Sequence, residues 1–150
     1  MPSQIRQKLV FRNTSAKELY ELYMNSKKHS VTTGATAKIS AKIGGRFVVH
    51  EGYATGENLL LVKDKLILQT WRASDWTKKD PDSTFMIYLE QKGKDTSLHM
   101  VHAHVPDEQA QSLRQGWHDF YWKPWKTYLK GEKKKLTRSI SKKRDKVPTP

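Results

Sequence analysis

The most constraining feature of the sequence is an aromatic segment close to its C-terminal end. Three of the five tryptophans fall within nine residues of the segment Gly116-Trp-His-Asp-Phe-Tyr-Trp-Lys-Pro-Trp-Lys-Thr-Tyr-Leu129. Its apolar residues recur every three to four positions, as in an amphipathic helix. Aromatic surface left in water costs free energy. A chain that contains such a helix therefore has to fold a broad apolar surface around it.

The middle of the chain predicts this surface as an antiparallel sheet. Segments of alternating apolar and polar residues, typical of half-buried strands, follow one another through short polar turns. These segments cover residues 4–11, 46–50, 53–62, 66–72, 84–91 and 96–105. Two short helices are expected after the first strand: one starts at a capping box of Ser15 and Glu18, and one ends before Gly34. This order favours an α+β fold with about six to seven antiparallel strands.

The aromatic helix is expected to bend and to end at two recognisable residues. Pro124 has no backbone N–H to donate, which predicts a bend, and Gly131 is expected to end the helix. Residues 1–130 would then form one domain and residues 131–150 a basic, disordered tail. Residues 130–150 hold nine of the 28 basic residues against two acids, so about half of the net charge of +13 lies there. Such a tail can contact phosphates or act as a solvated terminus; without a base-reading motif, the second interpretation is favoured and nucleic acid is not expected as a partner.

Several classes of protein are excluded by what the sequence lacks. There is no cysteine, which excludes disulfides and thiolate metal sites. No apolar run is long enough to span a bilayer and no signal sequence is evident, so we expect a cytoplasmic protein. The metalloprotease His-Glu-x-x-His, the hydrolase Gly-x-Ser-x-Gly, the P-loop and the dinucleotide-binding glycine motif are all absent. We therefore expect no catalytic residue and no cofactor.

Three histidines in the last predicted strand are the strongest candidates for chemistry. In a regular strand, His102 and His104 share one face and His99 points the other way. Two histidines at this spacing can bind a metal, but no third ligand or acidic partner is evident nearby. We expect no metal site here, and a hydrogen-bonded histidine in a cavity or at its rim instead.

The order and spacing of several motifs resemble the SRPBCC (START-like) superfamily and, within it, the family of homologues of the activator of heat-shock-protein-90 ATPase. The resemblance covers residues 1–130 and is carried by His29-Ser-Val-Thr-Thr-Gly34, Lys42-Ile-Gly-Gly-Arg-Phe47, Gly56-Glu-Asn-Leu-Leu-Leu-Val-Lys-Asp-Lys65, Ile67-Leu-Gln-Thr-Trp-Arg72, Thr96-Ser-Leu98 with Val105-Pro106, and Gly116-Trp117 through Tyr128-Leu129. It implies a helix-grip fold, in which a curved antiparallel sheet wraps round the C-terminal helix with a cavity between them. It also implies apolar or amphipathic small molecules as ligands. The eukaryotic namesake is a co-chaperone of the stress response with a separate N-terminal domain.

Alternation along the strands predicts which side chains face that cavity. The expected ligand-binding residues are Phe47, Trp71, Phe85, Met100, His102, Trp117 and Tyr121. His102 is expected to orient the ligand through a hydrogen bond. Trp76 stands in an otherwise polar loop and is expected at the cavity mouth, since an exposed tryptophan costs free energy.

Two further expectations concern packing. Arg72 and Asp75 are expected to form an ion pair at the edge of the sheet. On an ideal helical wheel Trp117 and Trp125 lie about 80° apart and Trp122 lies away from both. At least one of the three is therefore expected to stay partly exposed or to meet the short helices.

The function favoured by the sequence is a START-like domain that binds an apolar or amphipathic small molecule without catalysis, as a monomer or weak dimer. Two alternatives stay open. One is a protein-interaction module that acts on a chaperone of the heat-shock-protein-90 type. The other is an enzyme that uses His102 or His104 for general acid–base catalysis in the cavity.

Overall fold

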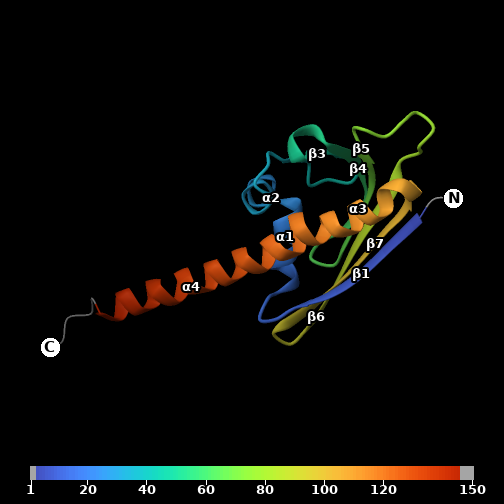
Figure 1. Ribbon diagram of the computed structural model, residues 1–150. Coiled ribbons are helices and arrows are strands. Elements are labelled where there is room, and N and C mark those ends of the chain that lie inside the picture. Colours follow the sequence, from blue (N-terminus) through green and yellow to red (C-terminus); the bar gives the residue numbers. More distant parts are fainter. Residues whose placement is uncertain (1–2, 146–150) are drawn as a thin grey trace.

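A single curved antiparallel sheet holds a long helical region across its concave side (Figure 1). The computed structural model describes residues 3–145, and the side chains of residues 3–135. The sheet has seven strands in the order β1-β7-β6-β5-β4-β3-β2. The strands are β1 Ser3–Phe11, β2 Lys38–Ile39, β3 Arg46–Val49, β4 Ala54–Val62, β5 Leu66–Ala73, β6 Ser83–Lys92 and β7 Asp95–Val105.

The helices lie at the two places that the sequence pattern indicates. Two short ones, α1 Ala16–Met24 and α2 Ser26–Thr33, follow β1, and a 3-10 turn, η1 His50–Gly52, joins β3 to β4. The C-terminal region comprises α3 Asp107–Trp117, a π turn η2 His118–Trp122, and α4 Lys123–Asp145. Together these elements confirm the predicted α+β fold and its helix-grip arrangement.

Local chemistry explains where α1 begins and where α2 ends. The predicted capping box is present, because the Glu18 backbone N–H donates to Ser15 Oγ at 3.1 Å and the Ser15 N–H donates to Glu18 Oε2 at 2.7 Å. Gly34 follows α2 with a φ of 76°, in the left-handed region that glycine adopts without strain.

The three tryptophans of the aromatic segment are all buried. Of the two expected arrangements, the structure shows the contact with the short helices, because the Trp125 ring lies 6.4 Å from the Tyr23 ring of α1. Trp117, Trp122 and Trp125 expose 3%, 1% and 1% of their surface. One reason is the π turn, in which the Lys123 N–H donates to the carbonyl of His118 five residues back, so each residue rotates by less than on an ideal wheel. The other is that α1 and α2 cover the side of the helix that the sheet leaves open.

The C-terminal helix continues beyond the predicted end at Gly131. It runs to Asp145, so the helical residues include most of the segment predicted as a disordered tail; residues 146–150 lie outside the described range. A glycine inside a helix costs only about 1 kcal/mol relative to alanine. The neighbouring glutamate and lysines are good helix formers, and Lys133 Nζ donates to the backbone carbonyls of Arg12 and Asn13, which anchors this part of the helix.

A β-bulge changes the direction of one of the histidines of β7. Between the pairs Ser3↔Val105 and Ile5↔His102, β7 contains one residue more than β1, and His104 has a φ of 60°. The extra residue reverses the alternation. His102 therefore points into the core and His104 is exposed, so the prediction that both share one face is wrong.

A buried polar network links α1 to the sheet beneath it. The Tyr23 hydroxyl donates to Gln69 Oε1 at 2.9 Å, and the Gln69 amide donates to Asn58 Oδ1 at 2.9 Å. The Asn58 amide in turn donates to the carbonyls of Ser40 and Lys42 at 2.6 and 3.0 Å. Each polar atom in this chain has a partner, as burial requires. The network fixes Tyr23 and hence the end of α1 beside the aromatic helix.

Candidate functional site

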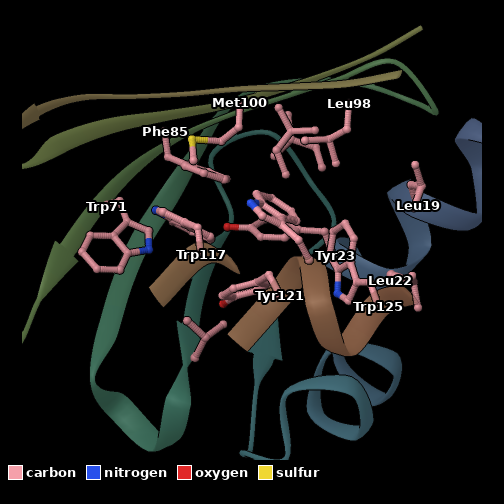
Figure 2. Close-up of a cluster of buried hydrophobic side chains, with 14 of the residues drawn as sticks. Leu19, Leu22, Tyr23, Trp71, Phe85, Leu98, Met100, Trp117, Tyr121 and Trp125 are labelled. Carbon is pink, nitrogen blue, oxygen red and sulfur yellow. The ribbon is translucent and has the colours of Figure 1, made fainter. Parts of the chain in front are cut away.

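A cavity of about 380 Å³ lies between the C-terminal helical region and the η1 end of the sheet. Its walls come from η1 and the residue that follows it, Tyr53, from the end of β5, and from α3 and η2. The lining residues are His50, Tyr53, Trp71, Ser112, Leu113, Gly116, Trp117, Phe120 and Tyr121. Most of these side chains are aromatic, and Trp71, Trp117 and Tyr121 lie close together in Figure 2. Such a volume falls in the range of small-molecule sites.

The seven residues predicted to line the cavity divide into two groups. Trp71, Trp117 and Tyr121 are in its wall. The others, Phe47, Phe85, Met100 and His102, are buried in the core behind that wall, with 2% or less of their surface exposed. The ring of Phe85 stacks on Trp117 at 4.4 Å between centroids and 10° between planes, which leaves no space between them.

Trp76 lies behind the cavity wall and not among the residues that line it. It is 7% exposed and packs against Trp71 at 5.5 Å between ring centroids. Its loop is held by Arg72, whose guanidinium donates to the carbonyls of Thr77 and Asp80, both at 2.6 Å. The ion pair of Arg72 is with Asp82 at 3.5 Å, so the predicted pairing with Asp75 is wrong.

The aromatic side chain that is exposed at the mouth of the cavity is Phe120. It exposes 56% of its surface and packs on the His50 ring at 5.8 Å. Tyr53, on the opposite wall, exposes 37%. A sequence pattern does not distinguish Phe120 from a core aromatic residue, because the π turn sets the direction of its side chain.

His102 is fully buried, and the protein occupies both of its ring nitrogens. The Trp117 indole N–H donates to His102 Nδ1 at 3.1 Å, and His102 Nε2 lies 2.7 Å from Ser83 Oγ. Because the Ser83 hydroxyl donates to the Trp71 carbonyl at 2.6 Å, it accepts from His102. Burial lowers the pKa of His102 to about 3, so the ring is neutral. It holds two cavity-wall residues in place.

A second chain of polar groups, which the sequence pattern does not predict, reaches the cavity. Tyr121 Oη lies between two imidazoles, 2.9 Å from His50 Nε2 and 3.0 Å from His29 Nε2. His29 Nδ1 lies 2.8 Å from the carbonyl oxygen of Tyr23. Burial lowers the pKa of His29 to about 4, lowers the pKa of His50 and raises that of Tyr121. The sequence places these side chains 71 and 92 residues apart, so no local signal joins them.

Strained backbone holds His50 at the cavity. His50 and Glu51 have φ values of 52° and 58°, and Gly52 follows at 99°. Non-glycine residues rarely adopt positive φ, and each such conformation costs about 1–3 kcal/mol. Strain of this kind often marks a functional segment. It turns the His50 ring out of the strand direction and toward Tyr121.

Removing the Tyr121 hydroxyl is expected to destabilise the protein through its two histidine partners. Tyr121→Phe keeps the aromatic packing but leaves a buried nitrogen of His29 without a partner, which costs about 1–3 kcal/mol. Urea unfolding followed by fluorescence measures the loss. Tyr88→Phe is the matched control, because Tyr88 is 42% exposed on the outer face of the sheet, and a surface change of this kind costs less than about 0.5 kcal/mol. Equal losses in the two variants would contradict a structural role for the hydroxyl.

The described residues hold no group of three or more histidine or carboxylate side chains that could bind a metal ion. Within residues 3–145, none of the helices is both long and apolar enough to cross a membrane. The polar side chains that line the cavity include the His50 imidazole, the Tyr53 and Tyr121 phenols and the Ser112 hydroxyl, which can exchange hydrogen bonds with a neutral molecule.

Comparison with known proteins places most of the chain in one family. The model of the family "Activator of Hsp90 ATPase homolog 1-like protein" matches residues 13–130. The Activator of 90 kDa heat shock protein ATPase homolog 1 of Mus musculus is 31% identical over 108 residues, which are 72% of this chain and 32% of that protein. The protein of the same name from Homo sapiens is 30% identical over 108 residues, with the same shares covered. The chain thus spans about a third of the length of these relatives.

Solved structures agree on the fold. An HSP90 activator from Plasmodium falciparum has a TM-score of 0.79 at 19% identity, over 84% of this chain and 95% of that one. The Aha1 dimer from Colwellia psychrerythraea has a TM-score of 0.67 at 13% identity, over 81% and 92% of the two chains. The family model matches residues 13–130, two relatives are at least 30% identical, and the fold is the helix grip seen in the solved structures. The chain therefore belongs to the Activator of Hsp90 ATPase homolog 1-like family.

Proposed function

We propose that this domain binds an apolar or amphipathic small molecule in the cavity beside α3 and η2, without catalysis. The observation that carries the proposal is the cavity of about 380 Å³ with aromatic walls and few polar groups. Burial of apolar ligand surface against these walls supplies the free energy of binding, about 25 cal/mol per Å². The polar residues in contact with the space include His50, Tyr53, Ser112 and Tyr121, and His102 is not among them.

The cavity can be filled from within by a single substitution. Gly116 lines the cavity, and a Cβ atom built on it meets only the Phe120 ring, at 3.7 Å from Cδ2 and 4.0 Å from Cε2, which are ordinary contact distances. A leucine at this position would occupy ligand space while the helix gains about 1 kcal/mol from the loss of glycine. Gly131→Leu is the matched control on the same helical region, because a Cβ there has no atom within 4 Å.

We expect Gly116→Leu to abolish binding of a neutral fluorescent probe, N-phenyl-1-naphthylamine, and Gly131→Leu to leave it unchanged. Binding is followed by probe emission and by quenching of tryptophan fluorescence, since Trp71 and Trp117 form the wall. Native mass spectrometry of the protein purified from its own host then identifies a co-purified molecule. Probe binding of equal strength in both variants would refute the proposal, because the probe would then be bound elsewhere.

A second candidate function is suggested by the relatives. Two of them are described as activators of the 90 kDa heat shock protein ATPase, and this chain covers 32% of each. We propose on this basis that the domain contacts a chaperone of that type. Adding the purified chain to the chaperone and measuring ATP hydrolysis tests the idea. An unchanged rate at micromolar concentrations, together with no complex in a pull-down, would rule it out.

A basic surface is the natural place to search for such a contact. Two grooves between β1 and α4 are lined by cations that include Arg12, Lys123, Lys126 and Lys130, and no carboxylate of the described chain lines either groove. A positive surface of this kind attracts an acidic partner and speeds association. The double substitution Lys126→Glu/Lys130→Glu would weaken a chaperone contact made here and leave probe binding in the cavity intact.

A further inference from the structure

The hydrogen-bond chain behind the cavity determines which nitrogen of His29 carries a proton. A carbonyl oxygen only accepts hydrogen bonds, so His29 Nδ1, 2.8 Å from the Tyr23 carbonyl, must carry a hydrogen. His29 is 1% exposed and its pKa is lowered to about 4, so the ring is neutral and its Nε2 has no hydrogen. Nε2 therefore accepts the hydrogen of the Tyr121 hydroxyl at 3.0 Å.

The hydrogen bond with Tyr121 also determines which nitrogen of His50 carries a proton. The Tyr121 hydroxyl has a single hydrogen and gives it to His29, so in its 2.9 Å contact with His50 Nε2 it accepts. His50 Nε2 is thus protonated, and in the neutral ring the lone pair is on Nδ1. No described residue bonds to this Nδ1, and the atom is not fully buried. His50 therefore presents an open hydrogen-bond acceptor at the cavity.

Trp71 contributes the apolar surface of its indole ring to the cavity wall. Its indole N–H has no acceptor among the described residues, but the nitrogen has less than 1 Å² of accessible surface, so an atom in the cavity cannot reach it. The cavity lining contains no lysine or arginine, so nothing there compensates the desolvation of an anion.

We infer that the ligand of this cavity is a neutral, flat apolar molecule that carries a hydroxyl group, whose hydrogen goes to His50 Nδ1. The inference rests on the proposed small-molecule function and adds the chemical class. The flat shape follows from walls made of aromatic rings. A hydroxyl suits the site because it has a hydrogen to donate and His50 Nδ1 can only accept one.

Displacement of the N-phenyl-1-naphthylamine probe by four naphthalenes tests the inference at pH 7.5. We expect 2-naphthol to bind about three- to tenfold more tightly than 2-methylnaphthalene, which has the same shape without the hydrogen bond. We expect 2-methoxynaphthalene to gain little over 2-ethylnaphthalene, because its oxygen has no hydrogen to donate to His50 Nδ1. In His50→Asn, which keeps a residue that tolerates positive φ, the preference for 2-naphthol should disappear while 2-methylnaphthalene still binds.

Equal binding of 2-naphthol and 2-methylnaphthalene by the native protein would overturn the inference and leave the proposed function standing. Failure of every naphthalene to displace the probe, or of the probe to bind, would overturn both. The ring-nitrogen chemical shifts of His50 give a measurement that needs no variant. We expect a protonated Nε2 and a bare Nδ1, and the opposite assignment would overturn the inference.

Discussion

Acidification from pH 7 to pH 5 is expected to lower the free energy of unfolding by about 4 kcal/mol, because two buried histidines stay neutral in the folded protein. His29 and His102 are 1% and 0% exposed, and their pKa values fall from 6.5 to about 4 and about 3. Between pH 6.5 and 4, these two histidines bind protons in the unfolded chain but stay neutral in the folded chain. The stability is therefore complete above pH 6.5 and is lost as the pH falls, by about 1.4 kcal/mol per pH unit for each histidine.

Urea unfolding at several values of pH measures this effect, and two substitutions separate it from the titration of carboxylates. The substitutions His29→Gln and His102→Gln each remove one group that binds a proton on unfolding, and each keeps polar atoms at the position. Each is expected to reduce the difference between pH 7 and pH 5 by about 2 kcal/mol, whatever its effect on stability at pH 7. A pH dependence as steep in both variants as in the native protein would contradict the assignment.

The second large effect is expected from a single methyl group in β4. Gly56→Ala should destabilise the protein by about 3 kcal/mol, at the upper end of the usual cost of overpacking. A Cβ atom at Gly56 would lie 1.9 Å from the Thr70 carbonyl oxygen and 2.5 Å from Phe47 Cε2. Thr70 belongs to the neighbouring strand β5 and Phe47 pairs with Gly56 from β3, so neither can move without shifting the sheet.

The matched comparison is Gly131→Ala, in a helix and with no atom within 4 Å of the new Cβ. It should raise stability by up to about 1 kcal/mol, since alanine is the better helix former. The two alanine variants are thus expected to shift the urea midpoint in opposite directions. A Gly56→Ala protein as stable as the native one would show that β3, β4 and β5 are less tightly packed than described.

The sequence predicted those parts of the fold that depend on near neighbours. The capping box needs only Ser15 and Glu18, three residues apart, and each strand shows its buried face in its own alternation. Trp71, Trp117 and Tyr121 were placed at the cavity for the same reason: their segments have a periodicity that marks an inner face. The family resemblance added the order in which these elements combine.

The errors occurred where the backbone leaves its regular period. The bulge near His104 reverses the side-chain direction at the end of β7, and the π turn at His118–Trp122 shifts the directions of the side chains around and after it. Alternation and helical periodicity predict neither irregularity. The end predicted at Gly131 failed because the cost of one glycine is small beside the propensity and the anchoring contacts of its neighbours.

Sequence patterns alone predict the α+β class, the aromatic helix that the sheet holds, and Trp71, Trp117 and Tyr121 as residues that face a cavity. What that cavity offers to a ligand depends on contacts that form only in the folded chain. His50, Tyr121 and His29 come from η1, η2 and α2, and hydrogen bonds of 2.9 and 3.0 Å join them. Each bond fixes the proton of the next group, so the open acceptor on His50 depends on partners distant in the chain. Alternation and spacing report which face is buried, but they contain no information about which buried polar atoms meet.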